Sequence, residues 1–287
     1  MAVKYLAGDR LIGTAAERLA LTTVTQDYTG AISTYSPNYF LKLDEGTGTS
    51  LTNAGDSSDI ASLSSTTNPS WVGGYNPSGY SLKFTQASGR TGDRIHTTDS
   101  GGSTGLPTND TQNWSLMMLV KLTGLGGQAN IWEWANGAQG MSTFNINSDG
   151  KMYLWYYDGS GNEVTANTNV VDGEWHTLGM THASGGGIVW YLDGVSDGTG
   201  TEGETYTDTN YSDTINLHGG SVGSGTMIFD SFFFKESVVT SSDMSGLSTK
   251  MKGTFTYPNL PNGAIFEESD TGKHYMFDGT DTWNEIT

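Results

Sequence analysis

The chain has 287 residues, enough for one large all-β domain with small appendages or for two medium-sized domains. Its 13 Lys and Arg against 31 Asp and Glu give a net charge of −18, a surface that repels the phosphates of nucleic acids. It has no Cys, which excludes disulfides and Cys-based zinc sites, and no apolar run approaches the ~18 residues of a membrane span.

Residues 1–35 form a distinct lead-in. The first ten residues contain an acid, Asp9, and no apolar core of signal-peptide length, so we expect release by lysis rather than by general secretion. Thr14 and Glu17 match a capping box, which predicts a short helix through Leu21. Residues that favour strands take over from Thr22. The lead-in is either a surface arm or an anchor onto a neighbouring subunit, and both readings stay open.

From residue 36 to residue 250 the pattern alternates between strands and turns. Alternating segments at 151–158 and 188–193 predict strands, and the nearly continuous apolar segment 227–235 predicts a strand buried on both faces. A short stretch at 243–247 has helical periodicity. Eight Asx-Gly pairs suit type I′ turns, because both central residues tolerate positive φ. They begin at Asn136, Asp149, Asp158, Asp172, Asp193, Asp197, Asn262 and Asp278.

The last part of the chain carries two strand-like pieces, 264–268 and 274–278, with a turn at Asp270-Thr271-Gly272 between them. We expect a small β-hairpin against which Trp283 packs. The sequence therefore predicts an all-β protein built on an antiparallel β-sandwich of the jelly-roll type. Its three parts are an N-terminal arm at 1–35, the jelly-roll domain at 36–250 and a C-terminal β-hairpin module at 251–287.

Three segments of the middle region resemble the laminin-G-like, concanavalin-type jelly roll. Residues 39–46 (YFLKLDEG) resemble its opening strand and Asp-Glu-Gly turn. The most specific match is a Trp175-His176 strand followed by residues 189–194 (VWYLDG). Residues 229–234 followed by 241–247 are similar to its last strand and short closing helix. The resemblance implies the fold, which hosts lectins, adhesion modules, glycosidases and virion proteins.

The two chain ends carry a second resemblance. Residues 260–275 (LPNGAIFEESDTGKHY) are similar to the tail of structural proteins from marine bacteriophages and related viruses, and residues 5–10 (YLAGDR) to their N-termini. This resemblance implies a capsid decoration, spike or fibre subunit that is assembled in the host cytoplasm and displayed on the virion surface. The arm and the hairpin would contact other virion subunits. A homo-oligomer is expected, since virion components act in symmetric copies.

No enzyme is predicted. Glycosidases of this fold carry their two carboxylates on one strand as Glu-x-Asp-x-(x)-Glu, and the partial match Glu268-Ser269-Asp270 lacks the final Glu. Gly-x-Ser-x-Gly occurs around Ser103 and Ser221 without the strand-to-helix turn of a nucleophile elbow. Residues 145–150 resemble the start of a calcium loop, but Tyr156 stands where such a loop needs a bidentate Glu.

Aromatic residues are the first candidates for binding. Strand alternation places Tyr153, Trp155 and Tyr157 on one face, where exposed rings would suit stacking on the C–H faces of sugars, with Trp132 and Trp134 alongside. The alternative is that these rings pack in the core or in a subunit interface, which aromatic rings do more often.

Loop carboxylates are the second candidates. Asp44, Asp193 and Asp197 could hold a calcium ion together with carbonyl oxygens, although no cofactor is required. The sequence thus favours a non-catalytic virion structural protein that displays a jelly roll. The alternative is a carbohydrate-binding or adhesion module for host or environmental polysaccharide, with or without calcium. Both can hold at once, since a surface protein can also bind host-surface glycans.

Overall fold

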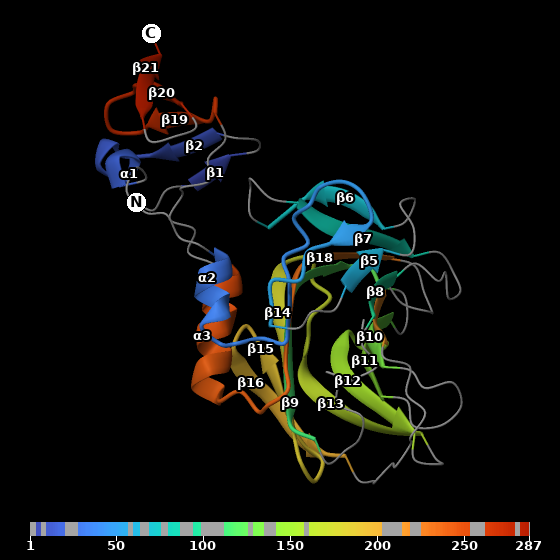
Figure 1. Cartoon of the computed structure of the whole chain (residues 1–287). Coiled ribbons are helices and arrows are strands. Elements are labelled where there is room, and N and C mark those ends of the chain that lie inside the picture. Colours follow the sequence, from blue (N-terminus) through green and yellow to red (C-terminus); the bar gives the residue numbers. More distant parts are fainter. Residues whose placement is uncertain are drawn as a thin grey trace.

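The computed structural model shows a β-sandwich with helices on one outer face, and a small sheet built from the two chain ends (Figure 1). It describes residues 4–6, 10–20, 28–56, 60–63, 69–75, 80–86, 94–98, 112–125, 129–134, 142–157, 161–202, 214–218, 225–252, 262–278 and 282–286. Within these residues no helix is long and apolar enough to cross a bilayer.

Two large sheets form the sandwich, and all pairings within them are antiparallel. The front sheet contains, in spatial order, β13 (Gly161–Asn169), β12 (Lys151–Tyr157), β11 (Ser142–Ile146), β10 (Ala129–Trp134), β17 (Thr214–His218), β8 (Arg94–Thr98), β5 (Ile60–Leu63) and β4 (Ser50–Leu51). The back sheet contains β16 (Val195–Thr201), β15 (Gly187–Leu192), β14 (Trp175–Ala183), β9 (Trp114–Thr123), β18 (Gly225–Lys235), β7 (Tyr80–Gln86) and β6 (Ser70–Gly73), with β3 (Tyr39–Leu41) paired to β18. The predicted all-β antiparallel jelly roll is confirmed.

The main core lies between the two sheets, because alternate side chains of each strand point inward. On β12, Met152, Leu154 and Tyr156 are buried in this core. Trp190 of the back sheet contacts Phe144 of the front sheet, with ring centroids 5.1 Å apart. The period-two pattern at 151–158 separates two faces of β12, and the structure shows that the face with Met152, Leu154 and Tyr156 lies in the core.

Strand β18 is buried on both faces, as its nearly continuous apolar sequence predicts. It pairs with β9 on one side and with β7 and β3 on the other. Phe232 and Phe234 enter the core between the sheets, whereas Phe233 belongs to a second apolar cluster on the outer face of the back sheet.

Helices α2 (Tyr28–Ser33) and α3 (Ser241–Lys252) cover that outer face (Figure 1). The predicted helical stretch at 243–247 lies inside α3, which extends beyond it at both ends. The start of α3 is capped, since the hydroxyl of Thr240 accepts a hydrogen bond from the backbone N–H of Asp243 at 3.1 Å.

Helix α2 corrects the expectation that strand-type residues continue after Thr22. Its sequence, YTGAIS, has weak intrinsic helix propensity. Ile32 is fully buried in the cluster that includes α3, and Lys250 of α3 donates a hydrogen bond to the carbonyl of Ala31 at 3.0 Å, in the last turn of α2. Tertiary contacts therefore stabilise a helix that the local sequence does not favour.

The two chain ends share one sheet, named the terminal sheet. Its strands, in spatial order, are β1 (Lys4–Leu6), β2 (Arg10–Gly13), β19 (Ile265–Glu268), β20 (His274–Phe277) and β21 (Trp283–Ile286). Helix α1 (Ala15–Ala20) follows β2. The expected hairpin forms between β19 and β20, and Trp283 packs against Phe266 with ring centroids 5.7 Å apart. Part of the segment 1–35, expected as an arm or an anchor, contributes to this sheet, because β2 pairs with β19 in parallel.

Polar contacts attach α1 to the terminal sheet. The predicted capping box is present: Glu17 accepts from the backbone N–H of Thr14 at 2.7 Å, and Thr14 accepts from the N–H of Glu17 at 3.3 Å. Arg18 Nε lies 2.7 Å from Glu268 Oε1, and its guanidinium lies 3.7 Å above the ring of Tyr275. Glu268, the residue of the partial glycosidase motif, is therefore held in a largely buried ion pair.

The Asx-Gly pairs that the structure describes are mostly turns. Asp193-Gly194 connects β15 to β16 with φ of 51° and 77°, as a type I′ turn requires, and Gly150 between β11 and β12 has φ of 77°. Asp197-Gly198 is a correction, because it lies inside β16 beside a bulge in the pairing with β15. The pairs at Asn136 and Asp158 lie outside the described residues, and the pair at Asp278 extends beyond them.

Candidate functional site

A row of polar residues crosses the front sheet. The register aligns one residue from each neighbouring strand, namely Ser62, His96, Asn216, Glu133, Thr143, Trp155 and Glu163, and we name this set the polar row. The row beside it consists of Leu63, Ile95, Leu217, Trp132, Phe144, Leu154 and Val164. Ile95, Phe144 and Leu154 are core residues. Because successive strand residues face opposite ways, the polar row occupies positions on the outer face of the front sheet.

Trp155 supplies an accessible aromatic ring in the polar row. It is partly exposed, and its register partner on β13 is the exposed Glu163. Tyr153, two residues earlier on the same face of β12, is only 3% exposed. Its burial, together with the negative charge of Glu163, raises the pKa of the Tyr153 phenol to about 12. Of these two rings, that of Trp155 is the more exposed, and its contact with a ligand stays a prediction.

The other three predicted aromatic residues are described by their backbone positions. Tyr157 pairs with Gly161 at the end of β12. Trp132 pairs with Phe144, and Trp134 pairs with Ser142. The structure thus places Tyr153, Trp155 and Tyr157 at alternate positions of one strand, whereas Trp132 and Trp134 stand in the cross-strand rows that alternate with the polar row. Their role in binding stays a prediction.

The predicted metal ligand Asp193 is surrounded by hydrogen-bond donors. Its Oδ1 accepts from the backbone N–H of Thr177 at 2.9 Å and lies 2.7 Å from Nζ of Lys252. Its Oδ2 lies 2.9 Å from Nδ1 of His176. Burial by itself would raise the pKa of Asp193, but these donors outweigh it and lower the pKa to about 2. The carboxylate therefore joins the β15–β16 turn to β14 and to the end of α3.

Asp197 and Asp44 also have protein partners. Asp197 accepts hydrogen bonds from the backbone N–H of Thr168 at 3.1 Å and from its hydroxyl at 2.5 Å, which ties β16 to β13 across the edge of the sandwich. Asp44 lies 2.7 Å from Nζ of Lys42. In the part of the chain that the structure describes, no three His, Asp or Glu side chains form a group that could hold a metal. Calcium binding at these residues stays a prediction.

Asp230 of β18 is a buried acid that is not among the site residues predicted above. Its Oδ2 accepts hydrogen bonds from the hydroxyl of Ser81 at 2.7 Å and from the backbone N–H of Tyr75 at 2.8 Å. Burial raises the pKa of this carboxyl to about 6. One acid within an otherwise apolar strand is the sequence signal that could have marked it.

A second buried polar group was also missed. Nδ1 of His182 lies 2.9 Å from the carbonyl oxygen of Gln112, and its Nε2 lies 3.1 Å from Oε2 of Glu202. The imidazole is stacked on Trp114, with ring centroids 5.2 Å apart. No short motif links these residues, since the contacts come from separate strands and the residues beside them. The two Gly-x-Ser-x-Gly segments lie outside the described residues.

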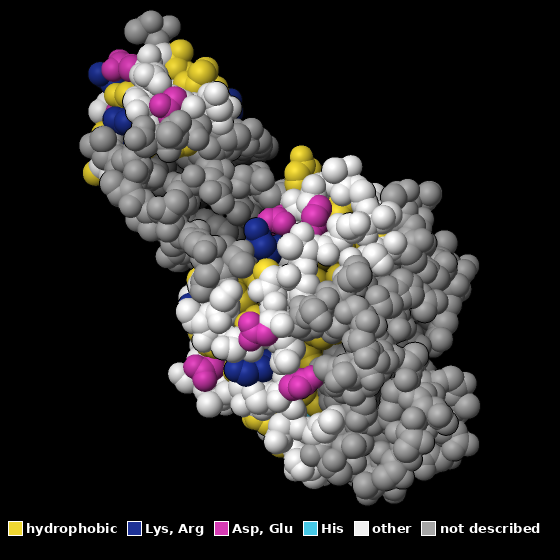
Figure 2. Space-filling model, in the orientation of Figure 1, with side chains coloured by type: hydrophobic (Ala, Val, Ile, Leu, Met, Phe, Trp, Pro, Cys, Tyr) yellow, Lys and Arg dark blue, Asp and Glu magenta, His cyan; other side chains and the backbone are white. Residues whose placement is uncertain are grey.

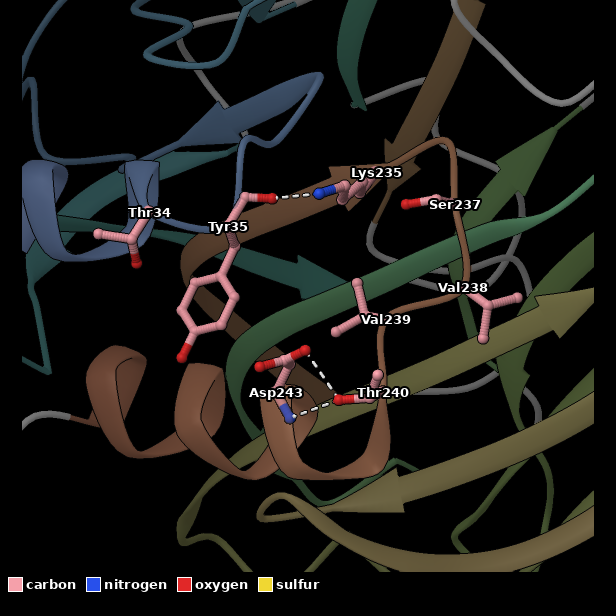
Figure 3. Close-up of a pocket in the computed structure, with 8 residues that line it drawn as sticks. All are labelled: Thr34, Tyr35, Lys235, Ser237, Val238, Val239, Thr240 and Asp243. Carbon is pink, nitrogen blue, oxygen red and sulfur yellow. Dashed lines mark hydrogen bonds between the residues drawn. The ribbon is translucent and has the colours of Figure 1, made fainter.

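A pocket of about 370 Å³ lies between the end of α2, the end of β18 and the start of α3 (Figure 3). Its lining residues are Thr34, Tyr35, Lys235, Ser237, Val238, Val239, Thr240 and Asp243. Lys235 donates a hydrogen bond to the carbonyl of Tyr35 at 2.6 Å, and Asp243 accepts one from the hydroxyl of Thr240 at 2.7 Å. Both charged groups of the pocket are thus bonded within the protein: Lys235 joins the end of β18 to the segment after α2, and Asp243 caps the start of α3.

Comparison with known proteins agrees with this architecture. Residues 96–233 match a family model, Laminin_G_3, described as the concanavalin A-like lectin/glucanases superfamily. No curated protein sequence matches the chain.

Solved structures with a similar fold include toxin binding domains. The binding domain of botulinum neurotoxin DC, solved with rat synaptotagmin II, is 14% identical with a TM-score of 0.60, over 86% of this chain and 55% of that one. A botulinum neurotoxin type C structure is 12% identical with a TM-score of 0.60, over 85% and 62%. The binding domain of Paraclostridial Mosquitocidal Protein 1 is 10% identical with a TM-score of 0.58, over 84% and 63%.

This chain therefore spans between half and two thirds of the length of these three structures, and at such low identity the similarity concerns the fold. The strand order, the core and the family match agree with one another. The protein contains a jelly-roll domain with the concanavalin-like, laminin-G-like fold.

Proposed function

We propose that this protein is a non-catalytic carbohydrate-binding module whose ligand lies along the polar row of the front sheet. The observation that carries the proposal is the partly exposed ring of Trp155, set among hydrogen-bonding residues at consecutive cross-strand positions. A sugar presents C–H faces that stack on such a ring and hydroxyl groups that need donors and acceptors beside it. Polar residue types in register across several strands suit an extended oligosaccharide.

The spacing of the carboxylates in the polar row favours binding over hydrolysis. Glu133 and Glu163 are separated by three strand spacings, or about 14 Å between their backbones. Glycosidases hold their two carboxyl groups roughly 5 to 9.5 Å apart, on either side of the scissile bond. These two residues therefore do not form such a pair, and Glu268 is held by Arg18 in the terminal sheet.

The similar structures support the same proposal at the level of the fold. One of them, botulinum neurotoxin type C, depends for entering cells upon interaction with two ganglioside molecules. Another, the ligand-binding domain of botulinum neurotoxin serotype D, was solved in complex with N-acetylneuraminic acid. We propose that this chain, like those proteins, recognises a glycan, either on a host or in the environment. The sequence identity to them is low, and the experiment below tests the proposal directly.

A glycan array provides that test, with and without calcium, for the wild-type chain and for Trp155→Ala. We expect the wild type to bind a subset of the array and W155A to bind it at least tenfold more weakly. Trp175→Ala is the matched control, because Trp175 is also a partly exposed tryptophan but lies on β14 against Tyr75. Binding by W175A equal to that of the wild type is expected. No binding by the wild type in either condition would remove the proposal.

A second candidate function is a structural role on a virus particle, with the terminal sheet as the attachment unit. This sheet joins both chain ends around its own apolar cluster, which contains Phe266 and Trp283. Its exposed side chains include Met276 and Ile286, and Figure 2 shows hydrophobic side chains on the surface of this part of the molecule. Mass spectrometry of purified particles would detect the protein if it has this role. Its absence from intact virions would exclude the role.

A further inference from the structure

The polar row has a negative charge next to its accessible ring. Glu163 is exposed and stands directly across from Trp155, at a spacing of about 5 Å between Cβ atoms. Glu133 occupies a further position of the same row, and none of the aligned residues is Lys or Arg. A ligand stacked on Trp155 therefore meets a carboxylate at contact distance.

Among the residues that the structure describes, no Lys or Arg is a register partner of Trp155 or Glu163. Lys151 lies on the same strand as Trp155, but four residues away, or about 13 Å along β12. Glu163, the direct register partner of Trp155, is therefore closer along the sheet to a ligand on that ring than Lys151 is. The chain as a whole carries a net charge of −18, and its long-range field also repels anions.

We infer that the ligand is a neutral polysaccharide, and that Glu163 excludes acidic sugars such as sialylated, sulfated or uronate-containing chains. This inference rests on the proposed carbohydrate-binding function and specifies its ligand class. An anionic substituent about 5 Å from Glu163 is repelled enough to weaken binding about tenfold in solvent of intermediate polarity. Uncharged hydroxyl groups, in contrast, can donate hydrogen bonds to the same carboxylate, so Glu163 both rejects acids and holds neutral rings.

The test uses an array that presents neutral oligosaccharides beside their sialylated or sulfated forms, probed with the full chain. We expect binding to neutral members, and binding to the matched acidic members that is at least tenfold weaker in about 0.05 M NaCl. The difference in affinity between neutral and acidic members should become smaller in about 0.5 M NaCl, because the Debye length falls to ~4 Å. Glu163→Gln should reduce the same difference in affinity, because it removes the negative charge beside Trp155.

Glu174→Gln is the control, because it removes the same charge from an exposed turn residue outside the polar row. It should leave the preference for neutral glycans unchanged. Acidic members that bind as tightly as their neutral forms, or more tightly, would overturn the inference while leaving the proposed function intact. An equal response of E163Q and E174Q would also overturn it, by assigning the selectivity to overall charge. Absence of binding to every member would remove the proposed function and this inference with it.

Discussion

The imidazole of His176 and the carboxylate of Asp193 lie 2.9 Å apart, and this pair joins three elements of the back face. His176 is the second residue of β14, Asp193 forms the turn between β15 and β16, and Lys252 at the end of α3 completes the cluster at 2.7 Å from Asp193. The second nitrogen of His176 lies 3.1 Å from Asp172. An imidazole between two carboxylates is stabilised in its protonated form.

Stability should therefore depend on the protonation of His176. The hydrogen bond to Asp193 raises the pKa of His176 above its usual value. The stabilisation is complete below about pH 6.5, the unfolded value, and is lost as the pH rises through the higher folded pKa. We expect His176→Ala to cost about 1 kcal/mol at pH 6, a figure reduced for solvent screening, and less at pH 9. Urea unfolding at both pH values measures this.

His274→Ala is the control for that series, since His274 is exposed on the terminal sheet. It should change the free energy of unfolding little at either pH. A cost of His176→Ala that stays constant from pH 6 to pH 9 would show that the imidazolium form contributes nothing.

Asp230 should give the opposite kind of pH dependence to an ordinary paired carboxylate. Its folded pKa of about 6 lies above the ordinary value of 3.8 for an Asp carboxyl, so the folded state favours the protonated acid. Stability tied to this group is complete below pH 3.8 and is lost as the pH rises through 6, by up to about 3 kcal/mol. Asp230→Asn keeps an acceptor for Ser81 and removes the charge, so its stability relative to the wild type should increase over this range. Urea unfolding of both proteins from pH 4 to pH 8 measures this difference. A free energy of unfolding that changes with pH in the same way in both proteins would contradict the assignment to Asp230.

The turn at Gly194 should tolerate no side chain. Its φ is 77°, and a Cβ there would lie 2.8 Å from both Ser245 Cα and Ser248 Cβ of α3. We expect Gly194→Ala to cost about 3 kcal/mol, the sum of left-handed backbone strain and displacement of α3. Gly185→Ala separates the two terms, because Gly185 has φ of 92° but no atom within 4 Å of an added Cβ, and it should cost about 1 kcal/mol. Thermal unfolding of both variants measures the two losses of stability. Equal losses would show that the contact of the added Cβ with α3 contributes nothing.

The parts of this fold that the sequence predicts correctly are those set by neighbouring residues. Alternation divides the side chains of β12 into two faces, one of which lies in the core, and Asp193-Gly194 fixes the turn from β15 to β16. The capping box of α1 depends on two residues three positions apart. Each of these signals lies within one turn or one strand, so it survives without knowledge of tertiary structure.

The features that the sequence did not reveal depend on distant contacts. The parallel pairing of β2 with β19 joins residues near opposite ends of the chain, and α2 is stabilised by Lys250. Alternation places Tyr153 and Trp155 on one face, but it cannot show that the first ring is 3% exposed while the second stays accessible. The polar row likewise becomes visible only once the register of every front-sheet strand is known.

Hydrogen exchange of the backbone amides, measured with and without a neutral oligosaccharide selected on the array, tests the polar row as a binding face most directly. We predict slower exchange on β11, β12 and β13, at residues 142–157 and 161–169, with no change in the terminal sheet. Slower exchange at α2 and the start of α3 instead, beside the pocket lined by Tyr35 and Asp243, would place the ligand elsewhere and contradict the proposed site.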